Sequence, residues 1–153
     1  MDSWDNRSVA LEELMPLIRE SLSQGKSVRF SPRGTSMLPM LRQGKDQIIL
    51  SPIREKLHRF DLPFYQREDG QYVLHRIVKA GETYTCMGDN QFVMESGIRH
   101  DQIIAVATGF VRGDKEHSVK EFSHKCYCRF WYYSRHLRHF WRRGIGWLRR
   151  HLK

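Results

Sequence analysis

The sequence predicts a mainly β domain with a helix before it and a basic amphipathic helix after it. Short runs of β-branched and aromatic residues, separated by turn signals, fill residues 26–113. Apolar residues at helical spacing precede this region and return after it. We therefore divide the chain into an N-terminal helical segment (1–25), a β domain (26–113), and a linker with a helical tail (114–153).

The first helix is predicted over residues 8–24, where apolar side chains recur every three to five positions. Ser8 is expected to cap its start, and Gly25 is expected to end it. Pro16 interrupts the pattern. The helix is therefore expected either to begin near Leu14 or to be kinked there.

Six strands are predicted in the β domain by alternating or continuous apolar runs. They cover residues 27–30, 47–50, 62–65, 71–78, 83–87 and 103–107, the last continuing to Val111. Turn residues at 68–70 and 81–82 separate neighbouring strands. Pro63 favours an edge position for its strand, because proline cannot donate a ladder hydrogen bond.

The charge is distributed unevenly along the 153 residues, which carry a formal net charge of +9. Residues 1–121 contain 17 Lys/Arg and 17 Asp/Glu, whereas residues 122–153 contain 9 Lys/Arg and no acidic residue. The β domain is therefore not a general binder of nucleic acid. The tail requires a partner of its own.

The three cysteines, Cys86, Cys126 and Cys128, form neither a disulfide framework nor a zinc-binding pattern. They indicate a reducing compartment. We expect no metal and no cofactor. The N-terminus lacks the pattern of a secretory signal, and no segment is apolar and long enough for a transmembrane helix.

Ser36 lies in the segment Gly34-Thr35-Ser36-Met37-Leu38-Pro39-Met40-Leu41. A serine between a glycine turn and an apolar, proline-containing stretch is held on irregular backbone, where its hydroxyl and nearby N–H groups can face a reacting group. The alternative is a serine that only stabilises its turn.

His75 lies within a predicted strand that is otherwise largely apolar. A neutral imidazole there can accept a proton from a hydroxyl. The alternative is a structural histidine bonded to a carbonyl. Gly88-Asp89-Asn90 has the composition of a turn, in which a carboxylate could orient a base.

These three motifs, in this order and at these spacings, resemble the signal peptidase I group of serine peptidases. That group shares its catalytic fold with the self-cleaving SOS-repressor peptidases. The resemblance covers residues 26–113. Bacterial signal peptidases usually have lysine where this chain has His75. The histidine form resembles the endoplasmic-reticulum, archaeal and spore-former type.

The resemblance implies that Ser36 is the nucleophile and His75 the general base. Asp89 matches the aspartate of the family's turn. The family's following Asp-Asp pair falls on Met94 and Glu95, so the resemblance leaves Glu95 or Asp89 as the orienting acid.

The resemblance also places the oxyanion and substrate-binding groups around the nucleophile. The Ser36 backbone N–H would meet the oxyanion, while the position that carries a second, hydroxyl donor in some relatives is Gly34. The residues implied are Gly34, Thr35, Met37 and Pro39. Core packing is the alternative for Met37 and Pro39.

The function implied is a serine endopeptidase that cleaves a precursor or leader peptide. The main alternative is a weakly active or inactive relative that serves as a peptide-binding or membrane-associated module. A self-cleaving regulator is less favoured, because the chain has no recognisable DNA-binding domain and no lysine base.

The tail is predicted to be helical, with one apolar stripe and arginines over much of its remaining surface. The stripe consists of Phe130, Tyr133, Leu137, Trp141, Ile145, Leu148 and Leu152. Gly144 and Gly146 are expected to break the helix. This composition favours an anionic membrane surface, which would make the protein peripheral on the cytoplasmic side. Nucleic acid, a partner protein and the body of the chain itself are the alternatives.

Overall fold

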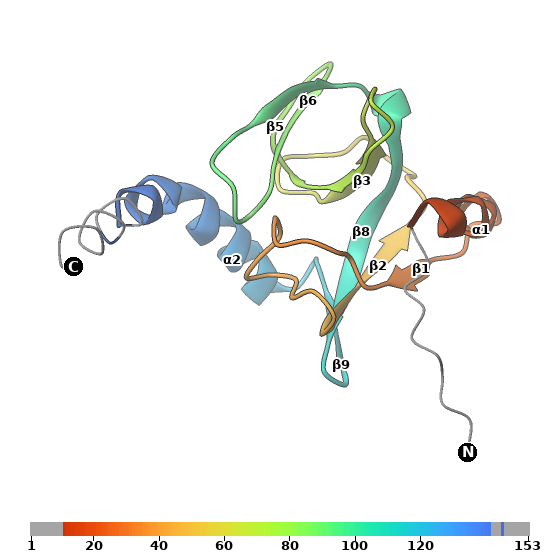
Figure 1. Ribbon diagram of the computed structural model, residues 1–153, viewed down its shortest axis with the longest axis horizontal. Coiled ribbons are helices and arrows are strands. Elements are labelled where there is room, and N and C mark those ends of the chain that lie inside the picture. The colour runs from red at the N-terminus through yellow and green to blue at the C-terminus, as the bar shows by residue number, and fades with distance from the viewer. Residues whose placement is uncertain (1–10, 142–144, 146–153) are drawn as a thin grey trace, which may run out of the picture.

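The structure is a computed structural model that describes residues 11–141 and residue 145. Two helices flank a set of nine strands (Figure 1). The elements are α1 (Leu11–Ser23), β1 (Val28–Phe30), β2 (Asp46–Ser51), β3 (Pro63–Gln66), β4 (Tyr72–Leu74), β5 (Arg76–Ala80), β6 (Tyr84–Met87), β7 (Glu95–Ile98), the short 3-10 helix His100–Gln102, β8 (Ile103–Arg112), β9 (Lys115–Ser118) and α2 (Phe122–Tyr133).

The strands form two antiparallel sheets. The six-stranded sheet has the order β1-β2-β8-β3-β4, with β9 paired to β8, and the three-stranded sheet has the order β5-β6-β7. The long strand β8 pairs with β2, β3 and β9, so it connects most of the larger sheet (Figure 1). The β-rich domain and the helices at both of its ends confirm the predicted class of fold.

The larger sheet is covered on both faces. On β3, Phe64 packs into a core beneath α1, and Tyr65 packs into a second core against the smaller sheet. On β4, Leu74 and Val73 divide between the two cores in the same way. This follows from the two-residue period of a strand, which sends neighbouring side chains to opposite faces.

Helix α1 packs against the larger sheet through the buried side chains Met15, Ile18 and Leu22. Gly25 ends it as predicted, with φ of 76° and with hydrogen bonds that close the last turn. Pro16 lies inside the helix, which extends upstream to Leu11, so a start near Leu14 is wrong. The predicted cap Ser8 lies outside the described residues.

Three strand predictions require correction. The run 71–78 is not one strand, because it breaks at His75 and passes from one sheet to the other. Strand β3 is internal rather than an edge, and it tolerates Pro63 because this is its first residue. Strands β7 and β9 were not predicted, because their polar sequences lack an apolar pattern.

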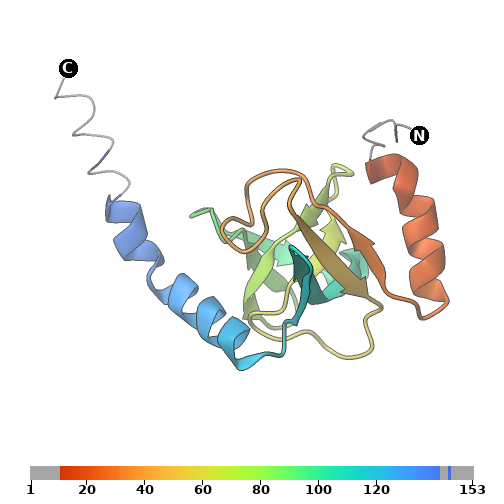
Figure 2. The same cartoon turned by 90° about the horizontal axis from the view of Figure 1, so that it is seen from below.

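The tail begins as α2 and continues, after a turn at Ser134, as a second helical segment over residues 135–141. The two helices α1 and α2 lie on opposite flanks of the sheets (Figure 2). The predicted break at Gly144 and Gly146 lies outside the described residues, as do Leu148 and Leu152. Among the helices described, none is long and apolar enough to cross a membrane.

Candidate active site

Ser36 is half-buried in the loop of residues 31–45 between β1 and β2, here called the Ser36 loop. Gly34 has φ of 93°, a left-handed conformation that glycine adopts readily. Its N–H donates to Gln43 Oε1 at 2.9 Å. The chain thus turns sharply just before Ser36, and this turn is hydrogen-bonded to Gln43 near the other end of the Ser36 loop.

Apolar side chains and one ion pair fix the Ser36 loop to the body. Met37, Met40 and Leu41 are buried in the core beneath α1. Arg42 donates from Nε and Nη2 to the two carboxylate oxygens of the fully buried Asp46, at 2.9 and 2.8 Å. These hydrogen bonds also lower the pKa of Asp46, so this carboxylate is ionised. Ser36 therefore projects from an anchored loop.

His75 occupies the break between β4 and β5, and its side chain is buried. Burial and the nearby charge of Arg67 lower its pKa to about 4. The imidazole is therefore neutral at pH 7. Within the described part of the chain, no hydrogen bond engages either ring nitrogen, so a lone pair remains for a proton.

Ser36 and His75 line the same cavity, which has a volume of about 240 Å³. The Ser36 loop contributes Gly34, Ser36 and Met37 to its lining, and all five residues of the segment 71–75 line it too. The structure thus brings together two residues that lie far apart in the sequence and that can act as nucleophile and base.

The backbone around Ser36 bears on the predicted oxyanion site. Over the described residues, the Ser36 N–H donates to no protein acceptor, so it can face an oxyanion. Gly34 is not a second donor, since its N–H is bonded to Gln43. Thr35 and Pro39 are both exposed and lie outside the lining of this cavity.

Glu95 lies at the start of β7. Its charge acts on the pKa of His75, but no hydrogen bond joins the two side chains. Arg67 donates from Nε and Nη2 to its two oxygens at 2.8 and 2.7 Å, and Tyr65 donates its hydroxyl at 2.8 Å. The hydrogen bonds from Arg67 lower the pKa of Glu95, so it is ionised. Its negative charge opposes the lowering of the pKa of His75.

Asp89 is not hydrogen-bonded to His75 either, although its charge acts to raise the pKa of His75. Its carboxylate is buried and accepts two hydrogen bonds from Arg76, both at 2.8 Å. The Tyr127 hydroxyl donates to the same carboxylate at 2.9 Å, and Trp131 Nε1 donates to the Asp89 backbone carbonyl at 2.6 Å. Asp89 thus joins β5 to α2.

The turn that contains Asp89 nevertheless contacts the Ser36 loop. The Asn90 N–H donates to the Ser36 carbonyl at 2.8 Å, and the Asn90 side chain donates to the Thr35 carbonyl at 3.1 Å. A Cβ on Gly88 would lie 2.7 Å from the Ser36 carbonyl oxygen, which is closer than atoms can pack. The Gly88-Asp89-Asn90 turn therefore supports the Ser36 loop.

Sequence reasoning did not identify Arg67 and Tyr65 as part of this site. Their spacing of two residues would place both side chains on one face of an extended segment. Nothing local in the sequence pairs them with Glu95, about 30 residues later, because that contact depends on how the two sheets pack.

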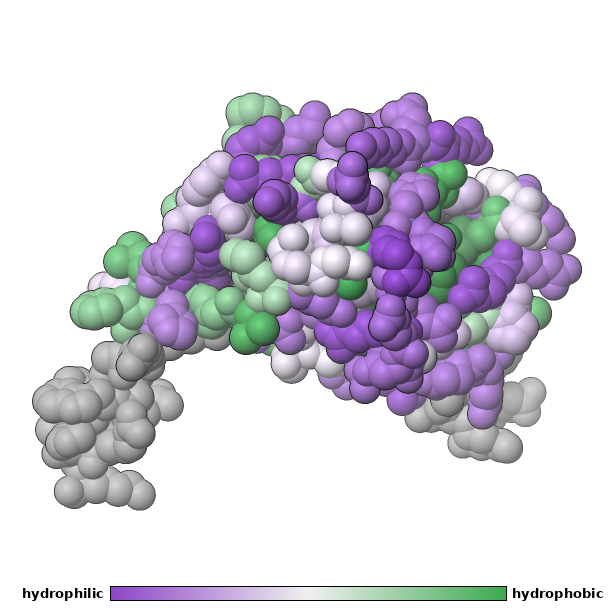
Figure 3. Space-filling view, turned by 90° about the horizontal axis from the view of Figure 1, so that it is seen from above, coloured by the Kyte–Doolittle hydropathy of each residue, from purple (hydrophilic) through white to green (hydrophobic). Residues whose placement is uncertain are grey.

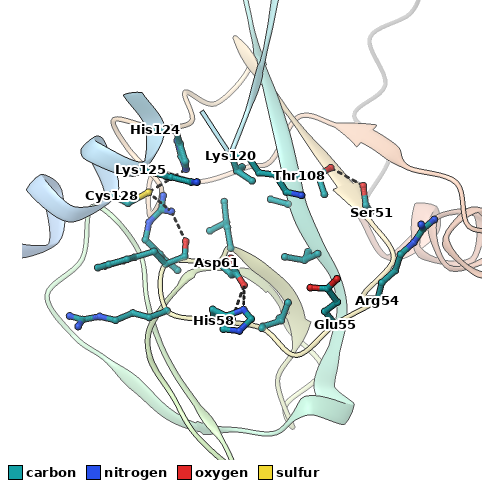
Figure 4. Close-up of a pocket in the computed structure, with 18 of the residues that line it drawn as sticks. Ser51, Arg54, Glu55, His58, Asp61, Thr108, Lys120, His124, Lys125 and Cys128 are labelled. Atoms are coloured by element: carbon teal, nitrogen blue, oxygen red, sulfur yellow. Dashed lines mark hydrogen bonds and ion pairs between the residues drawn. The ribbon is translucent and has the colours of Figure 1, made fainter. Parts of the chain in front are cut away.

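A larger cavity of about 650 Å³ lies between the loop after β2, strand β8 and α2 (Figure 4). It contains none of the four predicted catalytic residues. Lys120 and Lys125 lie on its helix side, opposite His58 and Asp61 (Figure 4). Ser27 and Ser51 also line it, but their hydroxyls are hydrogen-bonded to each other and, for Ser51, to Thr108. Neither serine belongs to the motifs described above, so size alone does not make this cavity the candidate active site.

Cys128 and His124 also line this larger cavity, with Sγ and Nε2 3.3 Å apart. Burial raises the pKa of the Cys128 thiol and lowers the pKa of His124 to about 4. Both groups are therefore neutral at pH 7. This pair lacks the thiolate that a reactive cysteine requires.

Among the residues that the structure describes, no group of three or more His, Cys, Asp or Glu side chains could hold a metal ion.

Comparison with protein-family models, curated proteins and solved structures gave no match to this chain.

Proposed function

We propose that this protein is a serine endopeptidase, similar to signal peptidase I, that cleaves a precursor or leader peptide. Ser36 is the nucleophile and His75 the general base. The observation that carries this proposal is the shared cavity, whose lining includes both Ser36 and the buried, neutral imidazole of His75. The motifs Gly34–Leu41, His75-Arg76 and Gly88–Asn90 support it through their resemblance to that group.

The chemistry follows from these groups. Ser36 Oγ attacks the peptide carbonyl while His75 accepts the hydroxyl proton, which gives a tetrahedral intermediate. The Ser36 N–H stabilises its oxyanion. His75 then transfers the proton to the leaving amine, and water hydrolyses the acyl-enzyme with His75 again as base. General base catalysis contributes ~10²–10⁴-fold, and an oxyanion donor contributes ~10²–10³-fold.

Glu95 supports the base through its charge. As His75 becomes an imidazolium in the transition state, the nearby ionised carboxylate stabilises it. Arg67 works in the opposite direction, because its positive charge lowers the pKa of His75. Burial and the charges of Arg67, Glu95 and Asp89 together set the strength of the base. Asp89 has no direct role in the chemistry in this scheme.

The substrate is an extended peptide bound along β4. This strand ends the order of the six-stranded sheet, and the adjoining segment 71–75 lines the cavity of Ser36. A peptide can pair with such a strand by main-chain hydrogen bonds. The scissile carbonyl of a peptide paired with β4 would then lie in the cavity, beside Ser36.

We further propose that the tail attaches the enzyme to the cytoplasmic side of an anionic membrane. Phe130, Tyr133, Leu137 and Trp141 are each more than 60% exposed, and Ile145 is about half exposed. Apolar and polar side chains alternate at this end of the described chain (Figure 3). Apolar area and basic charge together suit the headgroup region of a bilayer.

A second candidate function is an inactive peptide-binding module. Its support is that neither carboxylate is hydrogen-bonded to His75: Glu95 is bonded to Arg67 and Tyr65, and Asp89 is bonded to Arg76. A histidine without such a partner is less firmly held in its reactive orientation.

Digestion of a proteome-derived peptide library distinguishes the two functions. The wild-type protein is expected to generate new N-termini, and Ser36→Ala is expected to abolish them. Ser23→Ala, on α1, is the matched control and should cleave like the wild type. A library left intact by the wild type, or cut equally by Ser36→Ala, would contradict the peptidase proposal and favour the binding module.

A further inference from the structure

Helix α2 contacts the turn that supports the nucleophile. We infer that α2 holds the Ser36 loop in its reactive position, with Tyr127 and Trp131 as positioning residues. This inference rests on the proposed function, since it concerns the support of the same site. It assigns a catalytic consequence to a part of the chain outside the region of resemblance.

The first link is between α2 and Asp89. The Tyr127 hydroxyl donates to the Asp89 carboxylate at 2.9 Å, and Trp131 Nε1 donates to the Asp89 backbone carbonyl at 2.6 Å. Side chain and main chain of one residue are thus both held by the helix. Because Asp89 is buried, water does not readily replace these donors.

The second link is between the turn and the nucleophile. Asn90, the next residue, donates from its main chain to the Ser36 carbonyl and from its side chain to the Thr35 carbonyl. Gly88, on the other side, packs its backbone directly against the Ser36 carbonyl. Asp89 therefore faces the helix while its two neighbours face the Ser36 loop. A shift of the helix would move both contacts together.

The structure of α2 places the Tyr127 hydroxyl and Trp131 Nε1 on the same face of the helix. Tyr127 and Trp131 are four residues apart, and their rings stack with centroids 5.8 Å apart. The guanidinium of Arg138 lies 3.6 Å from the centre of the Trp131 ring and holds its outer side. His124 and Cys128 on the same face are buried against the body. This face of α2 is thus used for docking, while Phe130 and Tyr133 remain exposed.

Hydrogen–deuterium exchange tests the physical coupling without any substrate. Tyr127→Phe and Trp131→Phe each remove one donor and keep an aromatic ring. Each is expected to speed amide exchange in residues 34–41 and 88–91 by about tenfold, as loss of a buried hydrogen bond allows. Tyr133→Phe is the matched control, because Tyr133 is an exposed tyrosine on the same helix. Amide exchange in residues 34–41 and 88–91 that is as slow in both variants as in the wild type would overturn the inference.

Kinetics test whether the coupling serves catalysis. The probe is a fluorogenic form of the peptide that the wild type cleaves fastest in the library. Both variants are expected to lower kcat about tenfold with KM unchanged, because the nucleophile and not the peptide edge is displaced. An unchanged kcat, or a change in KM alone, would contradict a positioning role. Failure of the wild type to cleave any peptide would contradict the proposed function instead, and exchange would still decide the coupling.

Discussion

His75 is buried, and the charges of Arg67, Glu95 and Asp89 act on its pKa, so its titration should report both burial and charge. Burial and Arg67 lower its pKa to about 4, while Glu95 acts to raise it. A general base must be deprotonated, so activity should be present above this pKa and lost as the pH falls through about 4.

The pH dependence of kcat/KM checks this assignment. In Arg67→Gln, the positive charge near His75 is removed, and the acidic limb should move upward toward the ordinary histidine value of about 6.5. Lys26→Gln, at an exposed position outside the site, should leave the limb in place. A limb near 6.5 in the wild type, or one unmoved by Arg67→Gln, would contradict this view of the base.

Gly88 lies where the 88–90 turn packs against the Ser36 carbonyl. In Gly88→Ala the new Cβ would lie 2.7 Å from the Ser36 carbonyl oxygen, a backbone atom that cannot move aside alone. We expect a loss of about 1–3 kcal/mol in the free energy of unfolding, measured by urea denaturation, and a lower kcat.

Gly81→Ala is its matched control. Its nearest neighbour outside the adjoining residues would be the Thr83 carbonyl oxygen at 3.7 Å, an ordinary contact distance. The change in the free energy of unfolding should lie within about 0.5 kcal/mol of zero. Equal effects of the two substitutions would show that the close approach at Gly88 is unimportant.

At the scale of elements, the buried ion pair of Arg76 and Asp89 joins β5, the 88–90 turn and α2. Asp89→Asn would leave the Arg76 charge buried and unpaired. Removing one partner of such a pair costs about 3–5 kcal/mol. The midpoint of urea unfolding should fall accordingly.

The exposed pair of Arg29 and Glu116 provides the comparison. Both side chains are more than half exposed, so Glu116→Gln should change the free energy of unfolding by about 0–1 kcal/mol. A small effect of Asp89→Asn, similar to that of Glu116→Gln, would argue against a structural role for Asp89 and reopen a catalytic one.

Most of the helices and strands could be predicted from the sequence, but one important break between strands could not. Apolar period predicted α1, most strands and the helical start of the tail. It could not predict the break at His75, because apolar residues continue on both sides of that residue, in Val73-Leu74 and in Ile77-Val78. His75 lies at that break and lines the cavity that Ser36 also lines.

The site itself was predictable only in part. Ser36 and His75 could be selected from their motifs, and the structure brings both to one cavity. The environment of the carboxylates could not be predicted. Glu95 depends on Arg67 from the other sheet, and Asp89 depends on Tyr127 from the tail. Such long-range partners leave no local pattern in a single sequence.

At the scale of the whole molecule, the tail has two faces in different environments. The inner face docks on the 88–90 turn, as one of the alternatives for the tail anticipated. The outer face carries the exposed stripe. Removing the tail would therefore disturb the body as well, so single substitutions on the outer face are the better probe.

Flotation with vesicles of phosphatidylserine and phosphatidylcholine tests the membrane proposal. Phe130→Ser and Leu137→Ser should each reduce the bound fraction, because burial of an apolar side chain contributes about 1.5–3 kcal/mol. Higher salt should weaken binding further. Leu17→Ser, at an exposed leucine of α1, is the control and should bind like the wild type. Binding that none of these changes affects would contradict the outer face as the membrane site.

The measurement that tests the central claim most directly is a comparison of protein N-termini in cells that make this protein. Wild-type cells are compared with cells that carry Ser36→Ala at equal protein level. We predict a set of N-termini present only in the wild type, with a shared residue preference before the cut. Identical sets in the two strains would contradict the assignment of Ser36 as a peptidase nucleophile.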